Sequence, residues 1–159
     1  NVVALLEIFK KANVSNDWKL QIIGDGNERV NLEQFVEKNQ LQERIIFYGT
    51  KTSEEILELL RKSKIFGFTS LKEALPTVLV EAMFCSNAII SYNCNYGPSD
   101  IVKNNSGFLI DVNNKEDFIQ KLEMLTNSDE KLEKMMENAF KEAQKWKQNE
   151  ILKKWQEII

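Results

Sequence analysis

The sequence predicts an α/β fold, a doubly wound parallel sheet with helices on both faces. Short apolar runs of about five residues alternate with helical patterns of about ten, the spacing expected of strands and helices in turn. The 159 residues are 43% hydrophobic and 28% charged and include only 2 prolines, a composition that fits one globular domain. Ligands of such sheets bind beyond the carboxyl ends of the strands, so the loops after the strands should carry the function.

The first half of the chain repeats helix and strand. Apolar residues at every third or fourth position indicate helices, and short β-prone runs that end at a glycine indicate strands. Thr52 and Glu55 match a capping box, in which each side chain accepts a hydrogen bond from the other residue's backbone N–H, so a helix should start there. The elements expected in this half are helices at 2–9, at 28–39 and from 52, and strands at 19–23, 44–48 and 64–68.

The second half adds two strands and ends in helices. Pro76 suits the first turn of a helix, because the N–H that proline lacks would have no partner inside the helix. That helix should run through Val80 to about Cys85. Further strands are expected at 88–92 and 107–110, followed by helical structure after Lys115.

The absence of histidine excludes the most function classes. It removes Ser-His-Asp and Cys-His triads, histidine acid/base catalysis and every zinc site that contains histidine. Cys85 and Cys94 are too few for a four-cysteine zinc site or a secreted disulfide scaffold, and Cys85 lies in an apolar helical stretch that suits a buried thiol. We therefore expect a reducing, cytoplasmic setting.

Charge and hydropathy argue against a nucleic-acid-binding protein and against a membrane-spanning chain. The 21 basic and 24 acidic residues give a net charge of -3 without a basic stripe, so no nucleic acid partner is expected. No segment reaches the roughly 18 to 20 consecutive apolar residues of a membrane span. Because the chain opens inside an amphipathic helix and without a methionine, we expect it to be part of a longer protein.

Gly24 and Gly26 follow a strand and precede a helix, as in a dinucleotide-binding loop. However, Arg29 stands near the place of the third glycine, and the next strand ends in Gly49 and Thr50, without an acid for a ribose. A tight strand-to-helix turn is the favoured interpretation, and no phosphate-binding P-loop motif occurs elsewhere.

The segment 69–83 is the strongest candidate for a site. It joins a strand end to the helix at Pro76, whose first N–H groups would be free to bind an anion such as a diphosphate. Glu73 lies before the helix tip and Glu81 lies about 7.5 Å along its axis, so two carboxylates bracket the tip and could accept hydrogen bonds from hydroxyls. The alternative is that both are solvent-facing carboxylates with no further role.

The segment Glu73, seven residues, Glu81, with Leu75 and Pro76 inside it and Ala82 after it, resembles the motif of glycosyltransferase family 4. These group 1 enzymes are retaining transferases of the GT-B fold. The resemblance covers residues 1 to about 125 and includes further landmarks in order, at 20–26, 46–49, 97–102 and 106–110.

The resemblance implies the C-terminal, Rossmann-like half of a two-domain enzyme, which binds a nucleotide diphosphate sugar, with UDP as a guess for the nucleotide. It places Glu73 against the donor sugar as the catalytic residue, Glu81 on the ribose, helix-tip N–H groups on the diphosphate and the segment 49–51 near the base. No metal or other cofactor is expected, since there is no histidine and the donor-site loops carry no Asp-x-Asp pair. The full set of expected donor-binding residues is Glu81, Leu75, Pro76, Thr77, Val78, Gly24, Gly26, Gly49, Thr50 and Lys51.

The sequence departs from the family pattern at a few places. Ala74 stands where the family often has glycine, and Asp100 where it often has glutamate. The family's first strand, which is central in its sheet, and a loop with an arginine and a lysine for the phosphates would precede Asn1. We therefore expect this chain alone, without its N-terminal acceptor domain, to be inactive; the alternative function is a non-catalytic α/β module that binds a partner.

The tail is expected to pack as helices. We place a domain boundary between residues 1–126, the nucleotide-sugar-binding domain, and 127–159, helices that pack on it and face the missing domain. Core packing is the first interpretation of the apolar stripe. The alternative is a docking face, either for the N-terminal domain or, near Trp146 and Trp155, for peripheral contact with the inner face of a membrane. Interspersed glutamates weaken the membrane version. The stripe consists of Leu132, Met135, Met136, Ala139, Phe140, Ala143, Ile151, Leu152, Trp155, Ile158 and Ile159.

Overall fold

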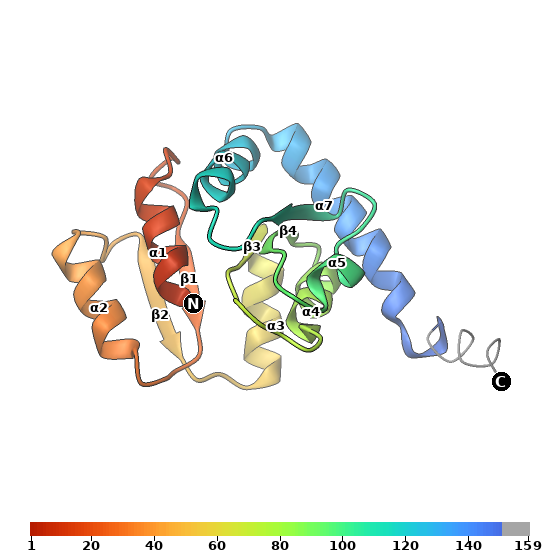
Figure 1. The fold of residues 1–159 in the computed structure, drawn as a ribbon, viewed down its shortest axis with the longest axis horizontal. Coiled ribbons are helices and arrows are strands. Elements are labelled where there is room, and N and C mark those ends of the chain that lie inside the picture. Colours follow the sequence, from red (N-terminus) through yellow and green to blue (C-terminus); the bar gives the residue numbers. More distant parts are fainter. Residues whose placement is uncertain (151–159) are drawn as a thin grey trace.

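A computed structural model describes residues 1–150 and has parallel strands in two sheets that lie side by side (Figure 1). One sheet pairs β1 with β2, and the other has the order β3-β4-β5. This confirms the predicted parallel α/β class, and each predicted strand is present with its ends within one residue. The strands are β1 (Leu20–Ile23), β2 (Ile45–Gly49), β3 (Ile65–Phe68), β4 (Ala88–Tyr92) and β5 (Gly107–Ile110).

Helices connect successive strands, as the sequence predicts. At α3, Thr52 accepts the backbone N–H of Glu55 at 3.3 Å and Glu55 accepts that of Thr52 at 2.9 Å, which confirms the capping box. Only the short α5 was not predicted, because its four residues are too few to show a helical period. The helices are α1 (Val2–Lys11), α2 (Arg29–Lys38), α3 (Ser53–Lys62), α4 (Thr77–Phe84), α5 (Pro98–Ile101), α6 (Lys115–Thr126), α7 (Asp129–Ala143) and a 3-10 turn, η1 (Gln144–Trp146).

Strand β4 forms the centre of the three-stranded sheet, and all five of its residues are buried. Its side chains alternate between the two faces: Ala88, Ile90 and Tyr92 join a core under α1, α6 and α7, and Ile89 joins a second core under α3, α4 and α5. Burial on both faces explains why four of the five residues are apolar. The exception, Ser91, donates its hydroxyl to the carbonyl of Tyr92 at 2.8 Å.

Helix α1 connects the two sheets. Ile8 packs into the core of the three-stranded sheet, whereas Leu6 and Phe9 pack with α2 and the β1–β2 pair in a third core. Although the strands divide into two sheets, the helix that covers them packs against both.

Helix α7 packs across the domain instead of extending away from it. Leu132 and Met135 join the first core, and Ala139 and Ala143 join the second. Core packing is thus confirmed for the described part of the tail, although Phe140 remains 45% exposed. The rest of the predicted stripe, Ile151, Leu152, Trp155, Ile158 and Ile159, lies outside the described residues, so the docking alternative and the domain boundary remain predictions.

Candidate functional site

The carboxyl ends of β1, β2 and β3, where the sequence predicts the site, lie at one edge of the domain. Thr69, which directly follows β3 and is only 6% exposed, donates its hydroxyl to the carbonyl of Asn1 at 2.9 Å, so α1 begins where β3 ends. Helix α1 then leads back to the start of β1, whose carboxyl end returns to the same edge. There the Gly24 N–H donates to the Gly49 carbonyl at 2.8 Å and closes the ends of β1 and β2 together.

The loop after β4 packs directly against the loop after β3. Gly97 has a φ of +102°, and a Cβ atom at this position would lie 2.3 Å from Cδ of Pro76 and 3.3 Å from Cα of Leu75. Only glycine allows this approach, which fixes the loop in front of α4. The Gly97-Pro98 pair marks a turn in the sequence, but nothing in the sequence indicates its contact with Pro76.

The tip of α4 begins at Thr77, one residue later than predicted, because Pro76 takes the N-cap position with a non-helical ψ of 81°. The Thr77 N–H donates to the carbonyl of Leu75 at 2.9 Å and the Leu79 N–H donates to that of Pro76 at 3.0 Å. The Val78 N–H has no acceptor among residues 1–150. Among the first three N–H groups of α4, that of Val78 therefore remains for an anion, whereas those of Thr77 and Leu79 are already used.

The two glutamates on either side of this tip have no hydrogen-bond or ion-pair partner within the described part of the chain. Glu73 is half-buried, and Glu81 is exposed on α4. Burial raises the pKa of the Cys94 thiol, and the charge of Glu73 raises it further. Burial likewise raises the pKa of the Cys85 thiol, with Arg61 opposing and Glu81 adding to the effect. Both carboxylates are thus available to accept hydrogen bonds from a ligand.

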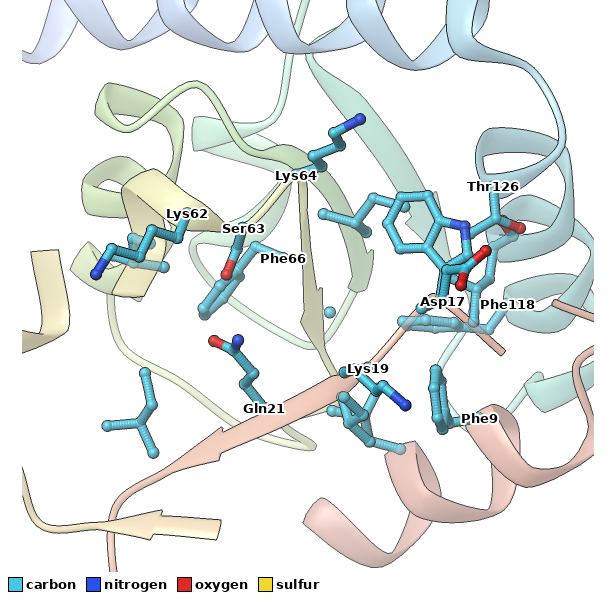
Figure 2. A pocket seen from close by; sticks show the side chains of 18 of the residues that line it. Phe9, Asp17, Lys19, Gln21, Lys62, Ser63, Lys64, Phe66, Phe118 and Thr126 are labelled. Atoms are coloured by element: carbon cyan, nitrogen blue, oxygen red, sulfur yellow. The ribbon is translucent and has the colours of Figure 1, made fainter. Parts of the chain in front are cut away.

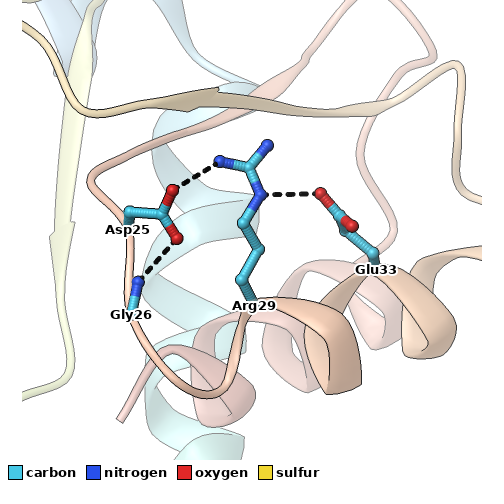
Figure 3. Close-up of polar contacts among 4 residues, drawn as sticks. All are labelled: Asp25, Gly26, Arg29 and Glu33. Atoms are coloured by element: carbon cyan, nitrogen blue, oxygen red, sulfur yellow. Dashed lines mark hydrogen bonds and ion pairs between the residues drawn. The ribbon is translucent and has the colours of Figure 1, made fainter.

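Arg29 organises the turn that contains Gly24 and Gly26 (Figure 3). Its guanidinium bonds Asp25 at 3.3 Å and Glu33 at 2.8 Å, while Asp25 accepts the N–H of Gly26 at 2.8 Å. The hydrogen bond to Glu33 is the main reason that the pKa of Arg29 is raised. These ion pairs favour the tight-turn interpretation of the loop. The i,i+4 spacing of Asp25, Arg29 and Glu33 in the sequence indicates that they can pair.

The Arg29 side chain also reaches the end of β2. A Cβ atom on Gly49, which has a φ of +66°, would lie 3.0 Å from the guanidinium Nη1, and the guanidinium lies 6.0 Å from the centre of the Phe47 ring. Beyond Gly49, Thr50 is exposed and Lys51 pairs with Glu55 at 2.9 Å. The predicted residues therefore form two groups at this edge, one at 24–26 and 49–51 and one at 73–81.

Two further observations concern the whole of residues 1–150. Within them, no group of three or more His, Cys, Asp or Glu side chains is arranged to hold a metal ion. No helix among them has both the length and the apolar character to cross a bilayer.

The comparisons with known proteins agree on one family. The sequence profile described as Glycosyl transferases group 1 matches residues 1–142. The amylovoran biosynthesis glycosyltransferase AmsD of Erwinia amylovora is 32% identical over 159 residues, all of this chain and 44% of AmsD. The poly(ribitol-phosphate) alpha-N-acetylglucosaminyltransferase of Staphylococcus aureus is 28% identical over 88% of this chain and 28% of its own length. The chain thus spans less than half the length of these curated relatives.

Solved structures agree on the fold. A variant of TarM from S. aureus, crystallised with UDP, fondaparinux and alpha-GlcNAc-glycerol, superimposes with a TM-score of 0.86 at 25% identity, over 99% of this chain and 32% of TarM. The C-terminal domain of a group 1 glycosyl transferase, LpcC of Francisella tularensis, gives 0.76 at 27% identity, over 89% of this chain and 74% of that domain's structure. The two-sheet domain therefore has the fold of a GT-B C-terminal half.

Proposed function

Because this chain belongs to the group 1 glycosyl transferases, we propose that it is the donor-binding half of a retaining hexosyltransferase that moves a sugar from a nucleotide diphosphate sugar to a glycan or lipid-linked acceptor. The observation that carries the proposal is the tip of α4. There, the unbonded N–H of Val78 is preceded in the chain by Glu73 and followed by Glu81, two carboxylates that have no protein partner among residues 1–150. A diphosphate at the tip leaves one carboxylate for hydroxyls on each side of it.

Each residue takes a role that its chemistry suits. Glu81 accepts hydrogen bonds from the ribose hydroxyls, and Glu73 acts at the donor sugar as the catalytic carboxylate. The Val78 N–H binds the diphosphate, and the segment 49–51 lies near the base. UDP in the TarM structure supports a uridine nucleotide in this chain.

The reaction breaks the bond between the anomeric carbon and the diphosphate oxygen and forms a bond from that carbon to an acceptor oxygen. The Val78 N–H at the tip, with cationic side chains from elsewhere in the protein, stabilises the charge that develops on the departing diphosphate. The acceptor attacks from the face that the leaving group occupied and passes its proton to the leaving phosphate, so the product retains the anomeric configuration. The acceptor binds in the part of the longer protein outside this chain, and the amylovoran named for AmsD supports a polysaccharide as the product.

Titration of the full-length protein with UDP tests the donor site. We expect Glu81→Ala to lose about 1.5 to 3 kcal/mol of binding, roughly ten- to hundred-fold in Kd, because it removes a charged hydrogen-bond acceptor. Isothermal titration calorimetry gives the affinity, and thermal unfolding of the same sample gives the stability.

Glu58→Ala is the matched control, since Glu58 is an exposed glutamate on another helix, α3, and is not among the proposed donor-binding residues. Equal affinity of both variants for UDP, with a lowered Tm in Glu81→Ala, would show that Glu81 is structural. No binding of UDP or of any nucleotide sugar by the unaltered protein would favour the alternative, a non-catalytic partner-binding module.

A further inference from the structure

Tyr96, in the loop after β4, has a backbone conformation that is unfavourable for a bulky side chain. Its φ is +69°, in the left-handed region that glycine and asparagine enter at lower cost. The next residue, Gly97, fixes the loop, because a Cβ there would lie only 3.3 Å from Cα of Leu75. Strain that the surrounding structure imposes in this way is concentrated at functional sites.

The ring of Tyr96 has no use within the described part of the chain that would offset this strain. The side chain is 76% exposed. Among residues 1–150, it has no hydrogen bond and no aromatic or cation-π partner. The compensating contact therefore comes from a bound molecule or from another part of the longer protein.

The order of the strands places Tyr96 relative to the proposed donor site. A cavity of about 560 Å³ is lined by both β1 and β3 and lies between them, with Gln21 on one side and Phe66 on the other (Figure 2). Since β2 pairs with β1 and β4 pairs with β3, the order across the molecule is β2, β1, β3, β4 (Figure 1). At the carboxyl edge, the loop with Tyr96 thus follows the loop with Glu73, on the side away from the segments 24–26 and 49–51.

This order puts the donor sugar next to Tyr96. In the proposed function the base lies near the segment 49–51 and the sugar at Glu73, so the side of the sugar away from the nucleotide faces the loop after β4. Neighbouring strands are about 4.8 Å apart, close to the width of one hexose ring. The contact between Gly97 and Leu75 is one residue from Tyr96 and two from Glu73, at about 3.8 Å of chain per residue.

A hexose needs two kinds of contact, and this part of the edge offers both. The hydroxyls around the rim of the sugar require hydrogen-bond acceptors, such as the carboxylate of Glu73. The faces of the sugar ring carry C–H groups, which favour an apolar surface. The ring of Tyr96 is such a surface, and Leu75, which is 48% exposed, extends it.

We infer that Tyr96 determines donor-sugar specificity, with its ring packed against the C–H face of the hexose. This inference rests on the proposed function and adds a residue to it. Because the ring lies on the side of the sugar away from the nucleotide, it discriminates between hexoses that differ on that side. It adds nothing to the binding of the nucleotide alone.

Titration of the full-length Tyr96→Ala protein with UDP and with UDP-sugars tests the inference. The Kd for UDP should stay within about two-fold of that of the unaltered protein, because the nucleotide does not touch the ring. Of UDP-glucose, UDP-galactose, UDP-N-acetylglucosamine and UDP-N-acetylgalactosamine, the one that the unaltered protein binds best should bind about ten-fold more weakly. Phe140→Ala is the control, since it removes another ring, 45% exposed on α7, and should leave every affinity unchanged.

Two further variants separate the ring from the backbone strain. Tyr96→Phe keeps the ring, so its Kd for the same UDP-sugar should stay within about three-fold. Tyr96→Gly removes the ring and relieves the strained φ, so it should weaken UDP-sugar binding as much as Tyr96→Ala does without lowering the Tm. Equal losses of affinity in Tyr96→Phe and Tyr96→Ala contradict packing by the ring. A lowered Tm of Tyr96→Gly with unchanged UDP-sugar affinity shows that Tyr96 is structural and overturns the inference.

The competing partners of the ring give different results. If Tyr96→Ala weakens UDP as much as the UDP-sugars, the ring contacts the nucleotide. If it lowers the Tm of the full-length protein and changes no affinity, the ring packs against the part of the protein outside this chain. Either result overturns the assignment to the sugar and leaves the donor site in place. No binding of UDP by the unaltered protein overturns the proposed function itself, and this assignment with it.

Discussion

At the scale of single residues, the tip of α4 depends on two features that have different origins. The tip's position in the chain follows from Pro76, whereas its rigidity follows from Gly97, some twenty residues later. A side chain at Gly97 would overlap Pro76 and would also have to adopt a φ of +102°.

Gly97→Ala is therefore expected to destabilise the full-length protein by about 1 to 3 kcal/mol. Urea unfolding measures the change. Gly26→Ala is the control, because no atom lies within 4 Å of a Cβ there and its φ is not in the left-handed region. Equal unfolding midpoints for the two variants would contradict the contact between the loops.

Glu73 is the residue whose role can be separated from binding. In the full-length enzyme we expect Glu73→Gln to lower kcat about ten-fold or more while Kd for UDP changes little, because it removes charge at the donor sugar and keeps the side chain's size. Initial rates with saturating donor give kcat, and calorimetry gives Kd. An unchanged kcat would remove the catalytic role.

At the scale of elements, one buried carboxylate ties α7 to the loop before β5. Glu142 is 5% exposed and accepts hydrogen bonds from Nδ2 of Asn104 and Nζ of Lys145, each at 2.7 Å. Burial alone would raise its pKa, but the hydrogen bonds from Lys145 and Asn104 outweigh this, so that the pKa of Glu142 is lowered. Helix α7, which packs on both cores of the three-stranded sheet, is held in register by this contact.

Glu142→Gln is expected to cost about 1 to 2 kcal/mol at neutral pH, because it weakens a charged hydrogen-bond network. A lowered pKa in the folded state gives stability that is present above the ordinary carboxyl pKa and is lost as pH falls through the folded value. The difference in unfolding free energy between the two proteins should therefore shrink as the pH falls below the ordinary carboxyl range. A difference that stays constant from neutral to acid pH would contradict this.

At the scale of the whole molecule, we propose that this chain is one half of a longer transferase, so the proposed chemistry is to be tested in the full-length protein. If N–H groups and cationic side chains stabilise the departing diphosphate, transfer by the full-length enzyme should survive excess EDTA with less than about a two-fold loss of rate. The product should keep the anomeric configuration of the donor, as NMR of the product shows.

Two results would reject this mechanism while leaving the fold assignment intact. One is activity that EDTA abolishes and Mg²⁺ or Mn²⁺ restores. The other is an inverted product. The 159-residue chain assayed alone is the control, and we expect it to transfer no sugar, because we propose that the acceptor binds outside it.

The sequence by itself determined the elements and their order. The run 88–92 is apolar at all but one position, as expected of a strand buried on both faces, and Thr52 with Glu55 specifies a helix start through bonds three residues apart. The Glu73 to Glu81 segment likewise indicated the family, because its residues are close in the chain. These features depend on local spacing, which a sequence displays directly.

Only the tertiary structure decided which loops touch and where the sheet is open. The contact of Gly97 with Pro76 and the bond from Thr69 to Asn1 join residues far apart in the chain, so no periodicity reports them. The tip of α4 was predicted to offer several free N–H groups, but the Thr77 N–H bonds to Leu75, a choice set by the backbone angles of Pro76. The family resemblance implied a missing central strand, yet the edges left open for it could be identified only after β1 and β3 had taken their partners, because main-chain pairing depends on neighbours in space and not on side-chain identity.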